Sequence, residues 1–343
     1  MTLQNLLRNG LLLGLTLALA GCKSETPKTT SGTDISKPAS DVTIKIDGSS
    51  TVFPVMEAVA EEFQNKTRTK VTVGISGTGG GFKKFTRGET DISNASRPIL
   101  TEEIQTAKEH GIEFIELPIC FDALTVVVHP KNALAEISIA ELKAMWEPAA
   151  QGKITTWKQV NAAWPDQKLT LFGAGSDSGT FDYFTEAVVG KAKSSRGDYT
   201  ASEDDNTLVQ GVGGDEHALG YLPYAYYEPN KAKLKALRVI GTNSKAVEPS
   251  PENVLNGTYM PMSRPLFIYV NRKSADKPEV KSFVEFMLKN VGELATQVKY
   301  LPLPANAYSM ATARFDQRQV GTVFGGVPEV GVTIEDILKR EAK

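Results

Sequence analysis

The sequence predicts an α/β protein in which the chain passes twice between two domains. Short apolar strands alternate with stretches of helical periodicity, which is the pattern of sheets built from parallel strands. Residues 42–343 number roughly 300, which is long for one hydrophobic core and sufficient for two. Two further apolar runs, at residues 124–128 and 266–270, are placed to carry the chain across and back. The predicted division is a discontinuous domain 1 at residues 42–126 and 264–343 and a domain 2 at residues 127–263.

Each strand predicted in the first part of the chain ends in a turn rich in glycine or hydroxyl groups. After the first of these turns, apolar residues recur at helical spacing from Val55 to Phe63. Pro54 suits the first turn of that helix, because the N–H that proline lacks has no partner there. The predicted strands and turns are 42–46 with 47–54, 70–75 with 76–81, and 91–92 with 93–98, and helices are expected to begin near Pro54, Phe82 and Thr101.

The same order of strand, turn and helix appears in the predicted domain 2. An alternating run at residues 169–172 precedes the turn 175–180, and an amphipathic stretch at 181–189 follows it. The other expected elements are a helix at 139–146, a helix from 207 after the acidic residues 203–206, a Tyr-rich strand region at 221–227, a helix at 278–298 and a helix at 334–339.

The first 22 residues have the pattern of an export signal, with an apolar run at residues 10–20 that is too short to span a membrane. The ending Leu19-Ala-Gly-Cys22 resembles the bacterial lipobox, which implies that Cys22 is lipidated; a plain secretory signal is the alternative. Residues 23–41 are rich in Ser, Thr, Pro and Lys and predict a flexible tether. Cys120 lies in an apolar run and is expected to be a buried small hydrophobic residue.

Several classes of function are excluded by composition and spacing. The formal net charge is −2 and no basic stripe with interleaved aromatics is present, so no nucleic-acid partner is expected. The three histidines lie far apart, and no His-Glu-x-x-His or Cys-x-x-Cys spacing occurs, so neither a metal nor a cofactor is predicted. The turn at 175–179 has Asp177 at its centre, where a nucleophile elbow requires Ser. We therefore predict no catalytic residues and no enzyme activity.

The turn Ser178-Gly179-Thr180 carries the most information, because it joins a strand to the start of a helix. Free N–H groups and the helix dipole favour an anion at such a point, and the hydroxyls add further donors. An ordinary helix N-cap is the alternative. Related turns occur at Gly48–Thr51 and Gly77–Gly81, and Ser96-Arg97 adds a guanidinium, which binds two oxygens of an oxyanion at once. Since carboxyl ends of parallel strands share one edge of a sheet, these turns are expected to meet in one cleft.

Five segments, taken together, resemble the phosphate-binding proteins of bacterial phosphate ABC transporters, and are most similar to PstS/SphX-type lipoproteins. They are Asp47–Pro54, Gly77–Phe82, Ser93–Pro98, Gly152–Trp157 and Ser176–Thr180, and the resemblance covers nearly the whole chain after the signal. It implies a two-lobed periplasmic-binding-protein fold of type II that closes on inorganic phosphate and delivers it to transmembrane permease subunits. The phosphate-binding residues that it implies are Ser50, Thr51, Thr78, Ser96, Arg97, Ser178, Gly179 (through its N–H) and Thr180.

Two positions depart from better-known members of that family, which place an Asp at Ser96 and an Arg at Ala174. We infer that Arg97 supplies the cationic contact instead; a surface residue before Pro98 is the alternative. The family's Asp accepts the proton of hydrogen phosphate and so rejects sulfate, which has no proton at neutral pH. Asp205, at a predicted helix start, is our candidate for that task, and a simple N-terminal cap is its alternative reading.

The predicted function is therefore high-affinity binding of inorganic phosphate for uptake by an ABC permease. The alternatives are a receptor for another tetrahedral oxyanion (sulfate, molybdate or arsenate), a phosphate-releasing hydrolase, and an adhesin or sensor with vestigial binding. The cleft is expected to close by hinge motion at the two crossing strands. We expect a monomer in the periplasm or at the cell surface, held to the membrane by the lipid on Cys22.

Overall fold

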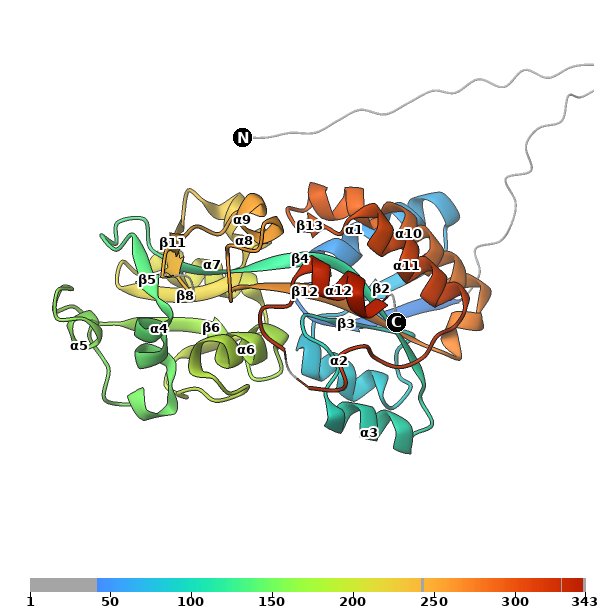
Figure 1. The fold of residues 1–343 in the computed structure, drawn as a ribbon, viewed down its shortest axis with the longest axis horizontal. Helices are drawn as coiled ribbons and strands as arrows, with labels where there is room; N and C mark the ends of the chain where they lie inside the picture. The colour runs from blue at the N-terminus through green and yellow to red at the C-terminus, as the bar shows by residue number, and fades with distance from the viewer. Residues whose placement is uncertain (1–41, 242–243, 328, 342–343) are drawn as a thin grey trace, which may run out of the picture. The chain divides into compact units, whose positions relative to one another are not determined.

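The computed structural model describes residues 42–241, 244–327 and 329–341 (Figure 1). The predicted export signal, its lipidation site Cys22 and the predicted tether lie outside the described residues. Among the residues that are described, no helix combines the length and the apolar character that crossing a membrane requires.

Most strands belong to one mixed sheet with the order β2-β1-β3-β12-β4-β8-β6-β7, in which β13 and β9 also pair with β4. A smaller sheet has the order β11-β10-β5. The strands are β1 Thr43–Gly48, β2 Lys70–Val73, β3 Ile92–Ala95, β4 Phe114–Val128, β5 Glu136–Ser138, β6 Thr170–Ala174, β7 Thr200–Ser202, β8 Ala218–Pro223, β9 Lys235–Ala236, β10 Arg238–Ile240, β11 Ala246–Val247, β12 Ser263–Asn271 and β13 Leu301–Pro302.

The helices cover the sheets on both sides of the crossing strands. They are α1 Phe53–Thr67, α2 Gly77–Phe85, α3 Thr101–Glu109, α4 Ile139–Trp146, α5 Trp157–Val160, α6 Gly179–Phe184 with a π-helical continuation Thr185–Val189, α7 Asp205–Gly214, α8 Tyr224–Tyr227, α9 Pro251–Leu255, α10 Pro278–Gln297, α11 Ala305–Asp316 and α12 Ile334–Glu341, and the short 3-10 turns are Pro148–Ala150, Glu228–Asn230 and Ser274–Asp276.

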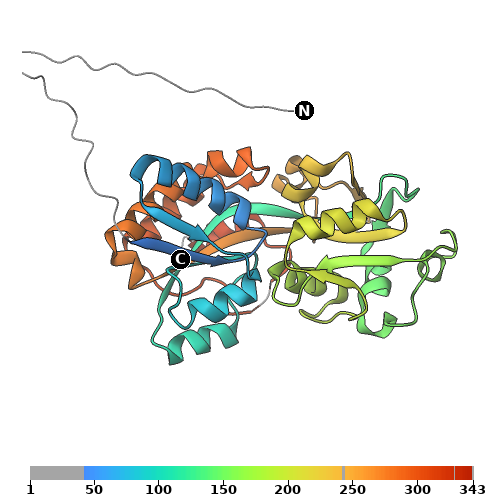
Figure 2. The same cartoon turned by 180° about the vertical axis from the view of Figure 1, so that it is seen from behind.

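Strands β4 and β12 connect two lobes. The first part of β4, Phe114–Ala123, pairs antiparallel with β12, and its last part, Leu124–Val128, pairs antiparallel with β8. We call β1–β3 and β13 with α1–α3, α10 and α11 lobe 1, and β5–β11 with α4–α9 lobe 2. Both views show these two groups toward opposite ends of the crossing strands β4 and β12 (Figures 1 and 2). The two predicted crossings are confirmed, although β4 begins ten residues before the predicted run at 124–128.

The prediction of parallel pairing holds for β1–β3 and for β6–β8, and it fails at the crossing and for β10 with β11, which pair antiparallel in lobe 2. β1 pairs parallel with β2 and β3, and β6 pairs parallel with β7 and β8, whereas β12 lies antiparallel to both of its neighbours. As a result, the predicted site residues follow the carboxyl ends of β1, β2, β3, β6 and β7.

Two local predictions were wrong. Helix α2 begins at Gly77 and not near Phe82, so the glycines form the first turns of the helix rather than a loop before it. The Tyr-rich region is a strand only as far as Pro223, after which Tyr224–Tyr227 form α8. In both places local propensity was a weak guide, because tertiary packing decides short elements.

The chain after α11 runs along lobe 1 and then reaches lobe 2. The ring of Phe324 packs edge-on against Phe267 of β12, with 5.2 Å between ring centroids. Farther along, the N–H of Gly331 donates to the hydroxyl of Tyr183 in α6 at 3.0 Å. The C-terminal segment therefore packs on both lobes.

Candidate functional site

The predicted turns meet where the lobes face each other. Ser50 and Thr51 follow β1, Thr78 lies in the first turn of α2, and Ser96 follows β3, all in lobe 1. Ser178, Gly179 and Thr180 begin α6 in lobe 2. These seven residues are buried. The expectation that turns at the carboxyl ends of strands gather in one place is therefore met for these residues.

Hydroxyl groups bond to one another between the lobes, in the pair Thr51 and Thr180, and within lobe 1, in the pair Thr78 and Ser96. The Oγ1 atoms of Thr51 and Thr180 lie 2.9 Å apart, and the Oγ1 of Thr78 lies 3.2 Å from the Oγ of Ser96. A Cβ at Gly179 would approach both Thr78 and Ser96 to 2.5 Å, so only glycine fits at this position. The cluster thus combines four hydroxyls with a helix start at which the first N–H groups have no intrahelical partner.

Arg264, which the sequence analysis missed, lies in the middle of this cluster and is 1% exposed. Its Nη2 donates to Thr180 Oγ1 at 2.8 Å and to Thr51 Oγ1 at 3.3 Å, and its Nη1 donates to the carbonyl of Gly179 at 3.0 Å. It is paired with buried Asp122, with 3.1 Å between Nη2 and Oδ2. Burial raises the pKa of Asp122, and the charge of Arg264 opposes that rise. A signal was present in the sequence, because Arg264 is a charged residue at the start of an otherwise apolar crossing strand.

The guanidinium of Arg97 is directed elsewhere. Its Nε donates to Asp182 at 2.6 Å, and its Nη atoms donate to the two carboxylate oxygens of Glu103 at 2.8 Å each and to the carbonyl of Pro98 at 3.1 Å. Although burial disfavours the charged form, these two carboxylates raise the pKa of Arg97. The alternative of a surface residue is wrong, because Arg97 is buried. Its contact with a ligand stays a prediction, while Arg264 is the guanidinium bonded to the hydroxyl cluster.

Asp205 is buried at the start of α7 and contacts the cluster through Ser50, whose hydroxyl donates to Oδ2 at 2.9 Å. The neighbouring Asp204 caps the helix by accepting from the N–H of Asn206 at 2.9 Å, so the capping role belongs to Asp204. Burial raises the pKa of Asp205 to about 7, against the bond from Ser50 and the charge of Arg264, which lower it. An acceptor that changes its charge near neutral pH is therefore placed beside the cluster.

This raised pKa gives a stability prediction. A carboxyl whose pKa is higher in the folded than in the unfolded protein contributes full stability below its usual pKa of 3.8 and loses it as the pH rises through 7. Between pH 4 and pH 8, Asp205→Asn should therefore lose less unfolding free energy than the parent, by roughly 2–4 kcal/mol. Urea unfolding at both pH values measures this difference, and equal losses in the two proteins would contradict it.

Two tyrosines support the turn after β1. Tyr226 of α8 donates to the carbonyl of Ser50 at 3.1 Å, and Tyr300 donates to the carbonyl of Thr51. Tyr226 belongs to lobe 2, so the turn is held from both lobes. Because these bonds fix the backbone, they orient the Ser50 and Thr51 side chains toward Asp205 and Thr180.

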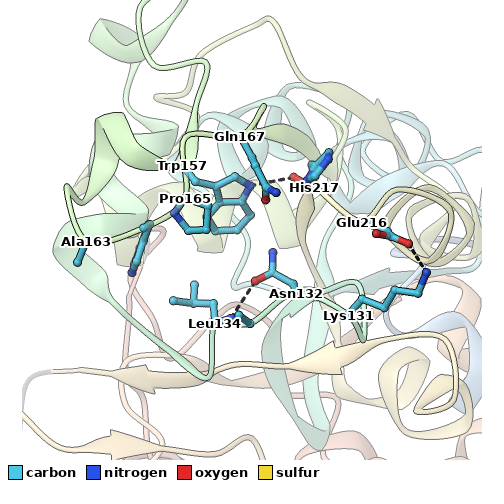
Figure 3. A pocket seen from close by; sticks show the side chains of 11 residues that line it. Lys131, Asn132, Leu134, Trp157, Ala163, Pro165, Gln167, Glu216 and His217 are labelled. Carbon is cyan, nitrogen blue, oxygen red and sulfur yellow. Dashed lines mark hydrogen bonds and ion pairs between the residues drawn. The ribbon is translucent and has the colours of Figure 1, made fainter.

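A separate cavity of about 500 Å³ lies in lobe 2 and shares no residue with the cluster (Figure 3). The indole of Trp157 donates to the carbonyl of His217 at 3.1 Å, and Lys131 pairs with Glu216 beside it (Figure 3). Across the described parts of the chain, no three His, Cys, Asp or Glu side chains are grouped so as to hold a metal ion.

Comparisons with known proteins agree with this geometry. Residues 24–291 match the family model described as a PBP superfamily domain. Protein SphX of Synechococcus elongatus is 54% identical over 299 residues, covering 87% of this chain and 88% of the relative. The phosphate-binding protein PstS of Staphylococcus saprophyticus is 39% identical over 279 residues, covering 80% of this chain and 84% of the relative.

A solved structure is also similar to this chain. It is a putative phosphate ABC transporter substrate-binding protein from Clostridium perfringens with bound phosphate, and it is 28% identical, with a TM-score of 0.66 and coverage of 77% of this chain and 100% of that chain. From the matched family model and the identity to both relatives, the chain belongs to the PBP superfamily and, within it, to the family of SphX and PstS phosphate-binding proteins.

Proposed function

We propose that this protein binds inorganic phosphate between its lobes and delivers it to the permease of a phosphate ABC transporter. The observation that carries the proposal is the position of Arg264, a buried guanidinium that donates to one hydroxyl from each lobe. A guanidinium with several neutral hydrogen-bond donors suits a tetrahedral oxyanion, because the negative charge of the anion is then distributed over many short hydrogen bonds. The names of the SphX and PstS relatives and the phosphate-bound neighbour support the same ligand.

The proposed phosphate-binding groups follow from the contacts of the cluster. Phosphate would exchange the mutual bonds of the hydroxyls for bonds to its own oxygens, and Asp205 would accept its proton. For Arg97, the pairs with Glu103 and Asp182 favour support of the neighbouring turn. The proposed set is Ser50, Thr51, Thr78, Ser96, Ser178, Gly179, Thr180, Asp205 and Arg264.

The remaining features of the proposal concern the whole protein. We propose the domain division at 126/127 and 263/264, with a hinge in the strands that cross there, and a monomer without catalytic activity. We also propose residence in the periplasm or at the cell surface with a lipid anchor on Cys22. Mass spectrometry of the membrane-extracted protein tests the anchor, because a lipidated N-terminal Cys22 has a distinct mass.

Calorimetric titration of the purified protein with phosphate tests the main proposal, with sulfate and arsenate as competitors. Tight phosphate binding without competition by sulfate would support the phosphate receptor. A second candidate, a receptor for another oxyanion, rests on Ser96 at the position where better-known relatives carry Asp. Equal binding of sulfate would favour it, and no binding of any oxyanion would reject both candidates.

A further inference from the structure

Asp177, in the turn before α6, joins the two lobes through its backbone and its side chain. Its N–H donates to Glu203 Oε1 in its own lobe at 3.1 Å. Its carbonyl accepts from the N–H of Gly79 in lobe 1 at 2.8 Å, and its Oδ1 accepts from Lys83 Nζ in lobe 1 at 2.7 Å. One residue of lobe 2 is thus held by its own lobe and by the start of α2.

The glycines at the start of α2 make this approach possible. A Cβ at Gly77 would lie 2.4 Å from the carbonyl oxygen of Asp177, and Gly77 has φ of +74°. A Cβ at Gly79 would lie 3.4 Å from the same oxygen, at the edge of ordinary contact. Side-chain atoms at Gly77 are therefore incompatible with the contact between the lobes, whereas a methyl group at Gly79 is close to being tolerated.

We propose that Asp177 and the segment Gly77–Gly79 form a latch, that is, a direct contact that holds the two lobes together. This contact keeps Thr78 close to the Ser178–Thr180 turn. Thr78 lies between the two glycines, and its hydroxyl reaches within 2.5 Å of the position that a Cβ at Gly179 would take. In this arrangement the hydroxyl of Thr78 is available to the ligand, and the glycines on either side of it allow the two lobes to come into close contact. The effect that we predict for the latch on phosphate binding rests on the proposed function.

The latch differs from the other contacts between the lobes. The bonds of Thr51 with Thr180 and of Ser50 with Asp205 involve proposed ligand groups, so phosphate would replace or rearrange them. The bonds of Asp177 involve none of those groups and remain when phosphate is bound. They therefore favour the closed arrangement with or without ligand, and we expect them to slow phosphate release.

The sharpest test is Gly77→Ala, because its clash with Asp177 exists only when the lobes are closed and adds there to the backbone strain that a φ of +74° imposes on alanine in every arrangement. The Lys83–Asp177 pair alone is a weak target, since both side chains are largely exposed and such pairs contribute little. In the purified protein, Gly77→Ala should raise the phosphate dissociation rate and the Kd at least tenfold, whereas Gly79→Ala should change each less than threefold. Stopped-flow release and calorimetry measure these values, and equal values in parent and Gly77→Ala would overturn the latch.

Small-angle X-ray scattering without phosphate separates the latch from the phosphate proposal. The radius of gyration of Gly77→Ala should exceed that of the parent even if neither protein binds phosphate, and identical values would overturn the latch independently. If Gly77→Ala does not fold, charge reversal replaces it. Each single reversal replaces a weak attraction with a repulsion at the contact, so Lys83→Glu and Asp177→Lys should each speed release a few-fold and the double variant should restore it; no change in any of the three would reject the latch.

Discussion

Replacement of Arg264 by methionine is expected to weaken phosphate binding at least about 100-fold, or roughly 3 kcal/mol. The guanidinium is the only cationic group bonded to the hydroxyl cluster among the described residues, and it is almost fully buried. An ion pair or charged hydrogen bond in such a place is weakly screened by water, so its loss is not offset by solvent. Calorimetric titration with phosphate at fixed ionic strength measures the change.

A buried Asp122 left without its partner complicates this variant, because an uncompensated buried charge destabilises the fold. The double variant Arg264→Met with Asp122→Asn removes both charges and should regain thermal stability without regaining phosphate affinity. Arg238→Met is the matched control, since Arg238 forms an exposed pair with Glu136 in lobe 2. Phosphate affinity within threefold of the parent in the double variant would show that Arg264 does not contact the ligand.

The sequence predicted the elements that local patterns determine. Turns after β1, β3 and β6 were found because a strand, small polar residues and a helix follow one another within about ten positions. The apolar faces of α1 and α10 were found for the same reason, and residues such as Val59 and Phe283 are buried as their spacing indicates. Eight of the nine predicted site residues lie in one buried cluster.

The cationic partner could not be predicted in this way, because it depends on contacts between distant parts of the chain. Arg97 was chosen because it adjoins Ser96, but neighbouring residues of an extended segment point to opposite sides. With Ser96 toward the hydroxyls, Arg97 points to Glu103 and Asp182. Arg264 reaches the cluster only through the antiparallel pairing of β12 with β4, and no local pattern records that pairing.

The length of β4 was underestimated for a related physical reason. Glu116 and Asp122 interrupt its apolar pattern, yet both are buried and satisfied by Tyr269 and Arg264. The predicted crossing comprised only the uninterrupted apolar run at 124–128, whereas the charged residues before it are also buried because their partners come from β12. The two charged residues of β4 therefore mark the positions at which β4 forms side-chain hydrogen bonds with β12.

Asp205→Asn is expected to remove the pH dependence of sulfate rejection. In the role proposed for it, Asp205 above its pKa of about 7 is a carboxylate that would accept the proton of hydrogen phosphate and repel sulfate, which has no proton to donate. Below that pKa the protonated carboxyl donates a hydrogen bond, so sulfate is tolerated. Competition by sulfate should therefore fall at least tenfold between pH 5.5 and pH 8.5 in the parent, as measured by competition calorimetry.

An amide at position 205 donates a hydrogen bond at every pH, as the protonated acid does. Asp205→Asn should bind phosphate more weakly at pH 8.5 and admit sulfate equally at both pH values. Asp204→Asn is the matched control, because Asp204 caps the same helix from an exposed position and makes no bond to Ser50. A parent that rejects sulfate equally at both pH values would assign the selectivity to a group other than Asp205.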